Sequence, residues 1–509
     1  MIAVINFGGQ YCHLIARKVR ELGTKAEIFP NTLTVQELKK INPDGIILSG
    51  GPASVNEKNS PEIDSKIFDL NIPVLGICYG LQLIAKNLGG TVQAGKSKEY
   101  GKNIISIKGN DPLLIGLKKE QVWLSHGDSV KTLPKTFVIS SSTKNCFVSS
   151  MYSKNKKIFG LQFHPEVHHT PNGKKILLNF LKVCRAKKDW DIASVTKQLQ
   201  KEIKSIVGNK KIIMGVSGGV DSLVASVLLH NIVPNQLFCV FVDNGLLRKN
   251  EVNYIESLYK KMGFKHFYSV KASKEFLFAL EGINDPEEKR KIIGFTFIKV
   301  FEEKAAELEQ EFGEISFLGQ GTIYPDRIES AEPSKTASKI KSHHNLSLPE
   351  DMNLKVVEPL KEFYKDEVRE IGKSLKIPKE FLDRHPFPGP GLGVRVLGEI
   401  SKEKLDILKE VDFIFIDELK KNKLYDKTWQ AFAAIFPVKA VGVKGDAREY
   451  SYIIALRAVN SVDGMTADWT KFSDVFLEKV SSRILNEVNG VARVLYDISQ
   501  KPPATIEFE

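Results

Sequence analysis

The feature that most constrains this chain is the string Ser217-Gly218-Gly219-Val220-Asp221-Ser222, which directly follows an apolar run at residues 212–216. A strand that ends in two glycines and then enters a helix can turn sharply and present bare backbone N–H groups. The partly positive N-terminus of the helix points at the same place, so the string predicts an anion pocket. No lysine follows the glycines, which excludes the Gly-Lys-Ser/Thr type of phosphate loop. An ordinary Gly-Ser turn is the alternative interpretation.

The carboxylate of Asp221 indicates a bound metal in this loop. A carboxylate repels phosphate, so it fits the pocket when a divalent cation such as Mg²⁺ lies between the two anionic groups. The string resembles the loop of ATP pyrophosphatases, which cleave ATP between the α and β phosphates. The resemblance implies ATP as a co-substrate, Mg²⁺ at Asp221, and the following ATP-binding residues: Ser217, Gly218, Gly219, Val220, Asp221, Ser222 and Leu223.

A second constellation predicts a nucleophile near the N-terminus. The string Gly76-Ile77-Cys78-Tyr79-Gly80 follows an apolar run at residues 74–77 and precedes a helical pattern. Glycines on both sides of the cysteine permit a strand-to-helix elbow that exposes the sulfur, and the helix N-terminus favours the thiolate. Downstream, His164 and Glu166 follow another apolar run, so an imidazole base and an orienting carboxylate are available. A buried structural cysteine and a loop histidine are the alternative interpretation.

These motifs resemble the class I glutamine amidotransferases, which release ammonia from glutamine through a γ-glutamyl thioester. The resemblance implies that Cys78 is the nucleophile, that His164 is the general base and acid, and that Glu166 orients the imidazole. It also implies that Gln82 and residues 125–128 line the glutamine pocket. An ammonia source in one chain with an ATP-cleaving loop predicts a ligation that forms an amide or amine.

Alternating apolar and amphipathic runs predict an α/β chain of about three domains. The first, residues 1–187, contains expected buried strands at 3–7, 45–48, 74–77 and 158–163. The second, residues 188–384, contains a βα series with expected strands at 212–216, 237–242 and 315–318. A cluster of Pro and Gly at 385–391 predicts the boundary to a third domain, residues 385–509, which mixes strands and helices.

The composition favours a reducing compartment and anionic ligands. The net charge is +12, but the lysines are spread along the chain without a dense basic block, so we expect no nucleic-acid partner. The five cysteines form no Cys-x-x-Cys pair, which argues against a metal or disulfide framework and favours a cytoplasmic protein. No apolar run reaches membrane-spanning length, so no membrane partner is expected.

Long strings along the whole chain resemble the GMP synthetase family. They are residues 243–248, 321–326, 341–345, 384–399 and 501–507. The resemblance implies an amidotransferase domain, a doubly wound parallel-sheet ATP pyrophosphatase domain and an α+β dimerisation domain, arranged as a homodimer. It further implies that xanthosine 5′-monophosphate (XMP) is adenylated with ATP and then aminated with ammonia from glutamine. The products would be GMP, AMP, pyrophosphate and glutamate.

The same resemblance implies contacts to XMP near the end of the chain, at Arg290, Gln430, Lys501, Ile506 and Glu507. Arg290 in a charged helix and Gln430 could instead be surface residues. A chain terminus is usually frayed, but the apolar Ile506 and Phe508 predict that this tail docks.

A polar segment with Lys335, Lys339 and Lys341 is a candidate lid over pyrophosphate. The lid string at 345–349 lacks the Gly-Gly that is common in the family. Two other functions are weighed against GMP synthesis. One is an ATP-dependent RNA-modifying ligase of the same ATP pyrophosphatase class, which the net positive charge of the chain favours. The other is a non-catalytic scaffold, which the complete set of chemical residues opposes.

Overall fold

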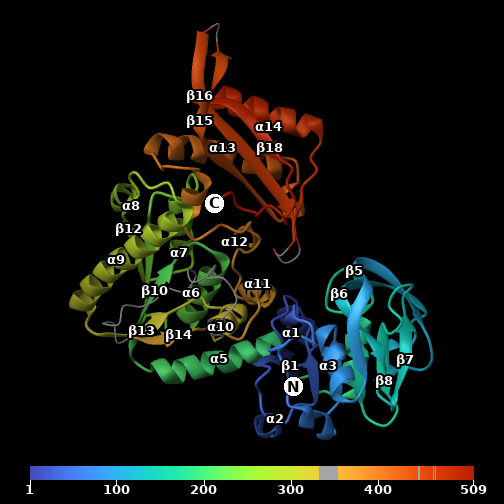
Figure 1. Ribbon diagram of the computed structural model, residues 1–509. Coiled ribbons are helices and arrows are strands. Elements are labelled where there is room, and N and C mark those ends of the chain that lie inside the picture. The colour runs from blue at the N-terminus through green and yellow to red at the C-terminus, as the bar shows by residue number, and fades with distance from the viewer. Residues whose placement is uncertain (332–353, 445–446, 462–463, 465) are drawn as a thin grey trace. The chain divides into compact units, whose positions relative to one another are not determined.

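The computed structural model describes residues 1–331, 354–444, 447–461, 464 and 466–509. The candidate lid at Lys335, Lys339 and Lys341 therefore lies outside the described residues. The chain forms two compact units, Met1–Val195 and Thr196–Glu509, drawn from blue to green and from green to red in Figure 1. In this described part of the chain, no helix has both the length and the apolar character that crossing a membrane requires.

The first unit is built on one nine-stranded sheet with the order β2-β1-β3-β4-β9-β8-β7-β5-β6 (Figure 1). The first five strands of this order pair in parallel, and the remaining pairs are antiparallel. The strands are β1 (Ile2–Asn6), β2 (Ala26–Pro30), β3 (Gly45–Leu48), β4 (Val74–Ile77), β5 (Thr91–Ile107), β6 (Lys119–Thr132), β7 (Phe137–Ser142), β8 (Ser150–Ser153) and β9 (Ile158–Leu161).

Helices cover this sheet and close its core. They are α1 (Cys12–Glu21), α2 (Val35–Ile41), α3 (Tyr79–Asn87) and α4 (Gly173–Val183), with short 3₁₀ turns η1 (Ser65–Asp69) and η2 (Pro112–Leu114). The parallel strands β3, β4 and β9 are buried along their whole length, as expected for strands with both faces covered. Helix α5 (Ile192–Val207) leads into the second unit.

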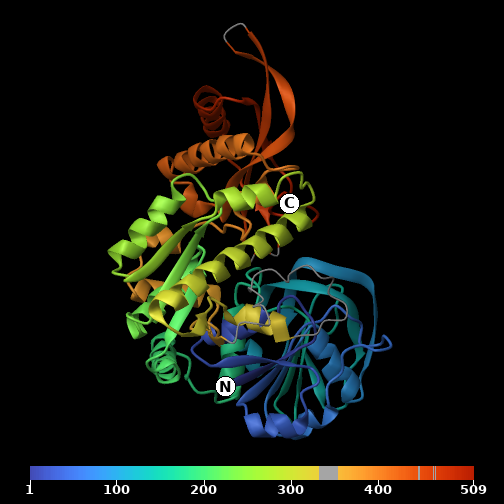
Figure 2. The same ribbon diagram turned by 90° about the vertical axis from the view of Figure 1, so that its left-hand side faces the viewer.

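The second unit begins with an all-parallel sheet of order β12-β11-β10-β13-β14. Its strands are β10 (Lys211–Val216), β11 (Leu237–Asp243), β12 (His266–Lys271), β13 (Ile315–Gly319) and β14 (Lys355–Val357). Gly215 of β10 faces Phe301 of α9. Gly319 of β13, which pairs with Met214 of β10, faces Leu229 of α6. Helices α6 (Val220–Ile232) and α9 (Pro286–Phe312) thus cover opposite faces, and Figure 2 shows α9 running along the sheet. The predicted doubly wound sheet is confirmed.

The remaining helices of this region are shorter. They are α7 (Glu251–Lys261), α8 (Ser273–Ala279), α10 (Tyr324–Ala331), α11 (Lys365–Ser374), α12 (Lys379–Leu382) and the turn η3 (Gly391–Arg395).

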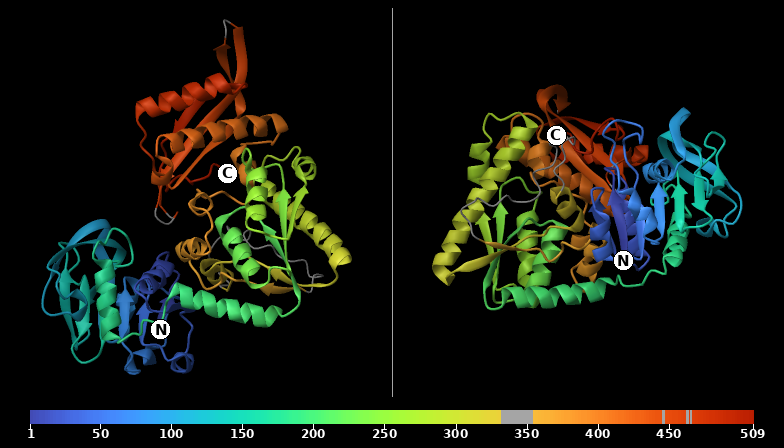
Figure 3. Two further views of the ribbon diagram at one scale, coloured as in Figure 1. Left: turned by 180° about the vertical axis from the view of Figure 1, so that it is seen from behind. Right: turned by 60° about the horizontal axis from the view of Figure 1, so that its bottom comes forward.

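A third sheet completes the second unit. Strands β15 (Gln430–Lys444) and β16 (Ala447–Asn460) form a long antiparallel hairpin, with β17 (Asp468–Trp469) and β18 (Val491–Asp497) also paired to β16. Helices α13 (Lys402–Lys421) and α14 (Asp474–Glu487) pack beside one another on this sheet (Figure 3), and the turn η4 (Tyr425–Lys427) precedes β15. One hydrophobic core runs from the parallel sheet to this sheet, which explains why the two form one compact unit.

The predicted strands agree closely with the structure. The expected strand at 45–48 is β3, that at 74–77 is β4, and those at 212–216 and 315–318 differ from β10 and β13 by one residue each. The long β5–β6 hairpin was not expected. All five cysteines are buried and free.

The packing of β3 against α3 allows a first test. A Cβ atom on Gly80 would lie 2.3 Å from the carbonyl oxygen of Leu48, which is backbone and cannot rotate away. We expect Gly80→Ala to lower the free energy of unfolding of the first unit by about 1–3 kcal/mol, because overpacking strains both elements. Calorimetric unfolding of the full chain measures the effect. The control is Gly294→Ala in α9, where nothing lies within 4 Å of the added atom; equal destabilisation by both variants would contradict the argument.

Candidate active site

Three neighbouring parallel strands of the first unit end at one edge of the sheet. Ser49 and Gly50 follow β3, Cys78 follows β4, and His164 lies three residues after β9. Because β3, β4 and β9 pair in parallel register, these loops converge. A Cβ atom built on Gly50 would lie 3.1 Å from His164 Cε1 and 3.7 Å from Cys78 Cβ, so the three residues share one site.

Cys78 occupies a strained elbow between β4 and α3. Its φ is 53° and its ψ is −104°, a conformation that costs energy for a residue with a side chain. The flanking glycines make the elbow possible, because a Cβ on Gly76 would lie 2.5 Å from backbone atoms of Gly80. The predicted strand-to-helix elbow is present in the structure, with Cys78 at the N-cap of α3.

His164 is held as an imidazolium by its neighbours. Its Nδ1 lies 2.6 Å from Glu166 Oε1, and both side chains are buried. Burial by itself lowers the pKa of His164, but the charge of Glu166 and the hydrogen-bonded Cys78 side chain outweigh it and raise that pKa to about 10. The protonated ring therefore stabilises the fold in full below pH 6.5, and this contribution is lost as the pH rises through about 10.

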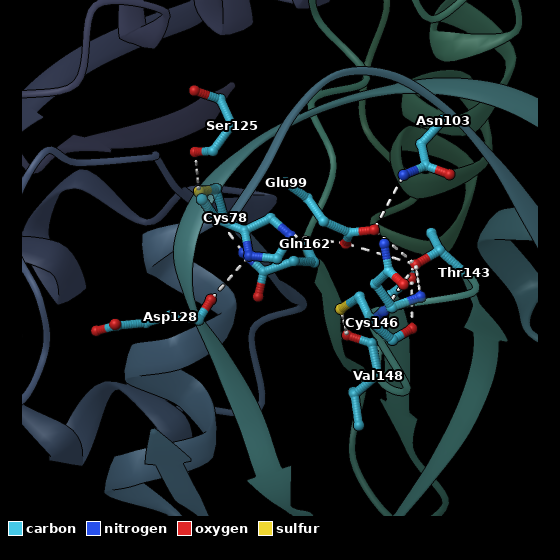
Figure 4. A network of polar contacts seen from close by, with 12 residues as sticks. Cys78, Glu99, Asn103, Ser125, Asp128, Thr143, Cys146, Val148 and Gln162 are labelled. Atoms are coloured by element: carbon cyan, nitrogen blue, oxygen red, sulfur yellow. Dashed lines mark hydrogen bonds and ion pairs between the residues drawn. The ribbon is translucent and has the colours of Figure 1, made fainter. Parts of the chain in front are cut away.

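Polar groups from two further elements approach the sulfur of Cys78. Gln162 Nε2 and the carbonyl oxygen of Ser125 each lie 3.7 Å from Cys78 Sγ (Figure 4). Gln82, on α3, donates from Nε2 to the carbonyl oxygen of Asp128 at 2.9 Å. Ser125 thus contacts the thiol and Gln82 is bonded to Asp128, and the glutamine pocket at these residues stays a prediction. Gln162 is a neighbour of the thiol that the sequence reasoning did not single out.

The phosphate-loop string of the second unit lies between β10 and α6. Gly218 has a φ of 72°, and Ser217 and Ser222 close the loop with an Oγ–Oγ distance of 3.0 Å. A Cβ on Gly321, after β13, would lie 3.1 Å from the backbone nitrogen of Ser222. The order of the sheet reverses between β10 and β13, and such a switch point is where open α/β sheets bind ligands.

The predicted loop residues differ in exposure. Ser217 and Gly219 are exposed and Asp221 is half-buried, whereas Val220 and Leu223 are buried. One carboxylate oxygen of Asp221, Oδ1, is buried without a hydrogen-bond partner among the described residues, and Lys365 Nζ lies 3.4 Å from the other oxygen. A buried, unpartnered carboxylate oxygen fits a hard cation such as Mg²⁺.

The C-terminal tail docks on the second unit, as its apolar residues predict. Glu507 accepts two hydrogen bonds from the fully buried Arg395, at 3.0 and 3.1 Å, and one from Gln430 Nε2 at 2.6 Å. Arg457, also fully buried, donates to the carbonyl oxygens of Thr505 and Ile506. Gln430, Ile506 and Glu507 are therefore brought together.

The other two predicted substrate residues have different neighbours. Arg290, on α9, donates to the backbone oxygen of Glu509 at 2.6 Å, and the adjacent Lys289 pairs with the Glu509 side chain at 2.5 Å. Lys501 donates to the carbonyl oxygen of Gly464 at 2.8 Å. Sequence reasoning missed Lys289, Arg395 and Arg457 as supports of the tail. Lys289 stands in a basic string, whereas Arg395 and Arg457 are each the single charged residue of an apolar string, a signal that could have indicated buried cations.

Three family models match the chain. The model for class-I glutamine amidotransferases matches residues 3–184, the model for NAD synthase matches residues 191–279, and the model for the GMP synthase C-terminal domain matches residues 417–508. Together with the elbow cysteine and the phosphate loop, these matches define the class. The chain is an amidotransferase linked to a nucleotide-binding unit of the NAD synthase type.

Relatives along the full length specify the family. The chain is 52% identical to "GMP synthase [glutamine-hydrolyzing]" of Thermosipho melanesiensis over 512 residues, which cover 100% of this chain and 99% of the relative. It is 52% identical to the protein of the same name from Aquifex aeolicus and 51% identical to that from Carboxydothermus hydrogenoformans, with equal coverage. The chain belongs to the family of glutamine-hydrolysing GMP synthases. The resemblance predicted from the sequence is confirmed, and the RNA-modifying ligase is not favoured.

The raised pKa of His164 allows a test. We expect Glu166→Gln to move the alkaline limb of the glutaminase pH profile down by roughly 1–3 pH units, because the loss of one opposite charge lowers the pKa of the imidazole. The measurement is kcat/KM for glutamine against pH. Glu57→Gln, an exposed carboxylate of the same unit, is the control and leaves the profile in place. An unshifted limb in Glu166→Gln would show that Glu166 does not set the charge of His164.

Proposed function

We propose that the first unit hydrolyses glutamine through Cys78, His164 and Glu166, and that the second unit uses the ammonia to convert XMP into GMP. As a member of its family, the chain is a ligase that takes the amide nitrogen of glutamine and consumes ATP. The observation that carries the site assignment is the buried His164–Glu166 pair, 2.6 Å apart, beside a cysteine at a strained elbow. The decisive assay supplies XMP, ATP with Mg²⁺ and glutamine, and seeks GMP, AMP, pyrophosphate and glutamate.

The chemistry at the thiol follows from the charges. The Cys78 thiolate attacks the amide carbon of glutamine, and the imidazolium of His164 gives its proton to the departing ammonia. The neutral imidazole then takes a proton from water, whose hydroxide cleaves the thioester and frees glutamate. The loop after β3 and the N-terminus of α3 at Tyr79 face this site, and their backbone N–H groups are suited to stabilise the oxyanion.

The ATP pyrophosphatase chemistry belongs to the loop after β10. We assign its residues 217–223 to the phosphates of ATP, with Asp221 holding Mg²⁺ through the oxygen that lacks a protein partner. The cation would neutralise phosphate charge at the point where pyrophosphate leaves. The 2-oxygen of XMP attacks the α-phosphorus, pyrophosphate departs, and ammonia then displaces AMP from the same purine carbon.

Recognition of XMP is assigned to Arg290, Gln430, Lys501, Ile506 and Glu507. The pairing of Gln430 with Glu507 and of Arg290 with the backbone of Glu509 supports one polar site at the tail. Cationic Arg290 and Lys501 suit the phosphate, and the carboxylate of Glu507 suits donors of the ring or ribose.

We further propose a homodimer of cytoplasmic chains with three domains, 1–187, 188–384 and 385–509, and no nucleic-acid partner. Exposed apolar side chains on the β15–β16 hairpin support a second copy as the partner; they are Val438, Val441, Val443 and Tyr450. Val441 and Tyr450 lie directly opposite each other in the hairpin, so they share one face, which favours a self-complementary contact.

Removal of the nucleophile separates the two activities. We expect Cys78→Ala to reduce glutamine-driven GMP formation by at least about a thousandfold while ammonia-driven formation continues, because the second unit needs only ammonia. Steady-state assays with each nitrogen source measure the two rates. Cys184→Ala, which removes another buried thiol of the first unit, is expected to keep both. Full glutamine-driven turnover in Cys78→Ala would end the assignment.

Removal of the loop carboxylate tests the metal. We expect Asp221→Asn to slow XMP-dependent pyrophosphate release by more than about 100-fold. The residues that hydrolyse glutamine at Cys78 are not changed by this substitution, so glutamine hydrolysis is expected to continue. Asp406→Asn, an exposed carboxylate on α13, is the control. Pyrophosphate release at the normal rate and normal Mg²⁺ dependence would contradict a metal at Asp221.

A further inference from the structure

A buried group of three metal-ligand side chains lies in the first unit, and one of them, His126, belongs to the segment 125–128 that is predicted to line the glutamine pocket. Glu99 on β5 and His126 on β6 are directly opposite in the antiparallel register, and Cys146 comes from the connection between β7 and β8. All three residues are buried, and their carboxylate oxygen, imidazole nitrogen and sulfur lie within 4.8 Å of one another. Figure 4 shows Glu99 and Cys146 within one network of polar contacts.

The ring of His126 presents a lone pair to this group. Its Nδ1 lies 2.9 Å from the carbonyl oxygen of Asp128, and a carbonyl only accepts, so Nδ1 carries a proton. In the neutral ring, Nε2 is then an acceptor, and it has no hydrogen-bond partner among the described residues. It faces Glu99 Oε2 at 3.4 Å, which is also an acceptor. Two lone pairs that face each other in a buried site repel unless a cation lies between them.

The surroundings hold the three side chains in place. Glu99 Oε1 accepts hydrogen bonds from Asn103 Nδ2 at 3.0 Å and from Thr143 Oγ1 at 3.1 Å. Glu99 Oε2 lies 3.4 Å from the same Thr143 hydroxyl and 3.4 Å from His126 Nε2. The backbone N–H of Cys146 donates to the same Thr143 hydroxyl at 2.8 Å. Metal-bound histidines typically donate their second ring N–H to a carbonyl, and metal-bound carboxylates are hydrogen-bonded from behind. His126 and Glu99 satisfy both conditions.

We propose that Glu99, His126 and Cys146 form a binding site for Zn²⁺. A thiolate, an imidazole and a carboxylate suit Zn²⁺ and not Mg²⁺, and three protein ligands leave one tetrahedral position for water. Binding releases the thiol proton of Cys146 to solvent and forms one metal–sulfur bond. The ion would tie β5, β6 and the β7–β8 connection together one residue from Ser125, whose carbonyl contacts the sulfur of Cys78.

The test uses the full chain with Cys78→Ala, which removes the thiol of the candidate active site, and Co²⁺ as a coloured probe for Zn²⁺. We expect a near-ultraviolet sulfur-to-cobalt charge-transfer band that saturates at one ion per chain and disappears when Zn²⁺ displaces Co²⁺. The band reports sulfur ligation, so Co²⁺ bound by oxygen ligands such as Asp221 does not contribute. Because the nucleophile is absent, the result is independent of the assignment of Cys78.

Matched variants decide the outcome. Adding Cys146→Ser abolishes the band, whereas adding Cys184→Ser, at another buried thiol of the same unit, leaves it unchanged. Adding Glu99→Gln weakens Co²⁺ binding at least about tenfold, because a charged ligand is lost. The proposal is overturned if the Cys78→Ala chain shows no band, or if the band survives Cys146→Ser. Should Cys146→Ser fail to fold by circular dichroism, unchanged affinity in Glu99→Gln overturns it equally.

Discussion

Parallel strand pairing is the constraint on which both candidate sites depend. In a parallel sheet all strands end at the same edge, so residues far apart in sequence meet there without any further device. In the first unit this edge collects the loops after β3, β4 and β9, and with them Cys78 and His164. In the second unit it collects the loops after β10 and β13, at the point where the strand order reverses. The parallel pairing of strands therefore positions the residues of both candidate sites, although the chemistry proposed for the two sites differs.

Close backbone approach is the second requirement, and glycine meets it in both units. At the cysteine elbow, Gly76 and Gly80 allow β4, β3 and α3 to touch through their backbones. At the phosphate loop, Gly218 takes a left-handed conformation and Gly321 lets β13 approach Ser222. The elbow presents sulfur beside an imidazolium, whereas the loop presents hydroxyls and a carboxylate. The difference in chemistry therefore lies in the side chains that similar turns expose.

Buried charge explains why the end of the chain is ordered. Arg395, Arg457 and Lys289 are each fully or almost fully buried, and an unpaired buried cation would cost several kcal/mol. Each finds its partners in the tail: Glu507, the carbonyl oxygens of Thr505 and Ile506, and Glu509. The tail and the cations stabilise each other, so the last residues belong to the fold of the second unit. Removal of the tail would take Glu507 from Arg395 and Glu509 from Lys289, whereas Arg457 would keep its ion pair with Asp497.

Local patterns in the sequence determined the strands, the elbow at Cys78 and the loop at 217–222. Apolar runs and glycines set the backbone conformation of the few residues around them, so these elements do not depend on distant segments. Whole-chain strings determined the family, which full-length relatives confirm. Tertiary structure alone decided the contacts between distant segments. It paired Glu99 with His126 across the β5–β6 hairpin, turned the carboxamide of Gln162 toward Cys78, and buried Arg395 and Arg457 against the tail. Charge and burial of a side chain depend on what packs around it, and that is settled only when the whole chain has folded.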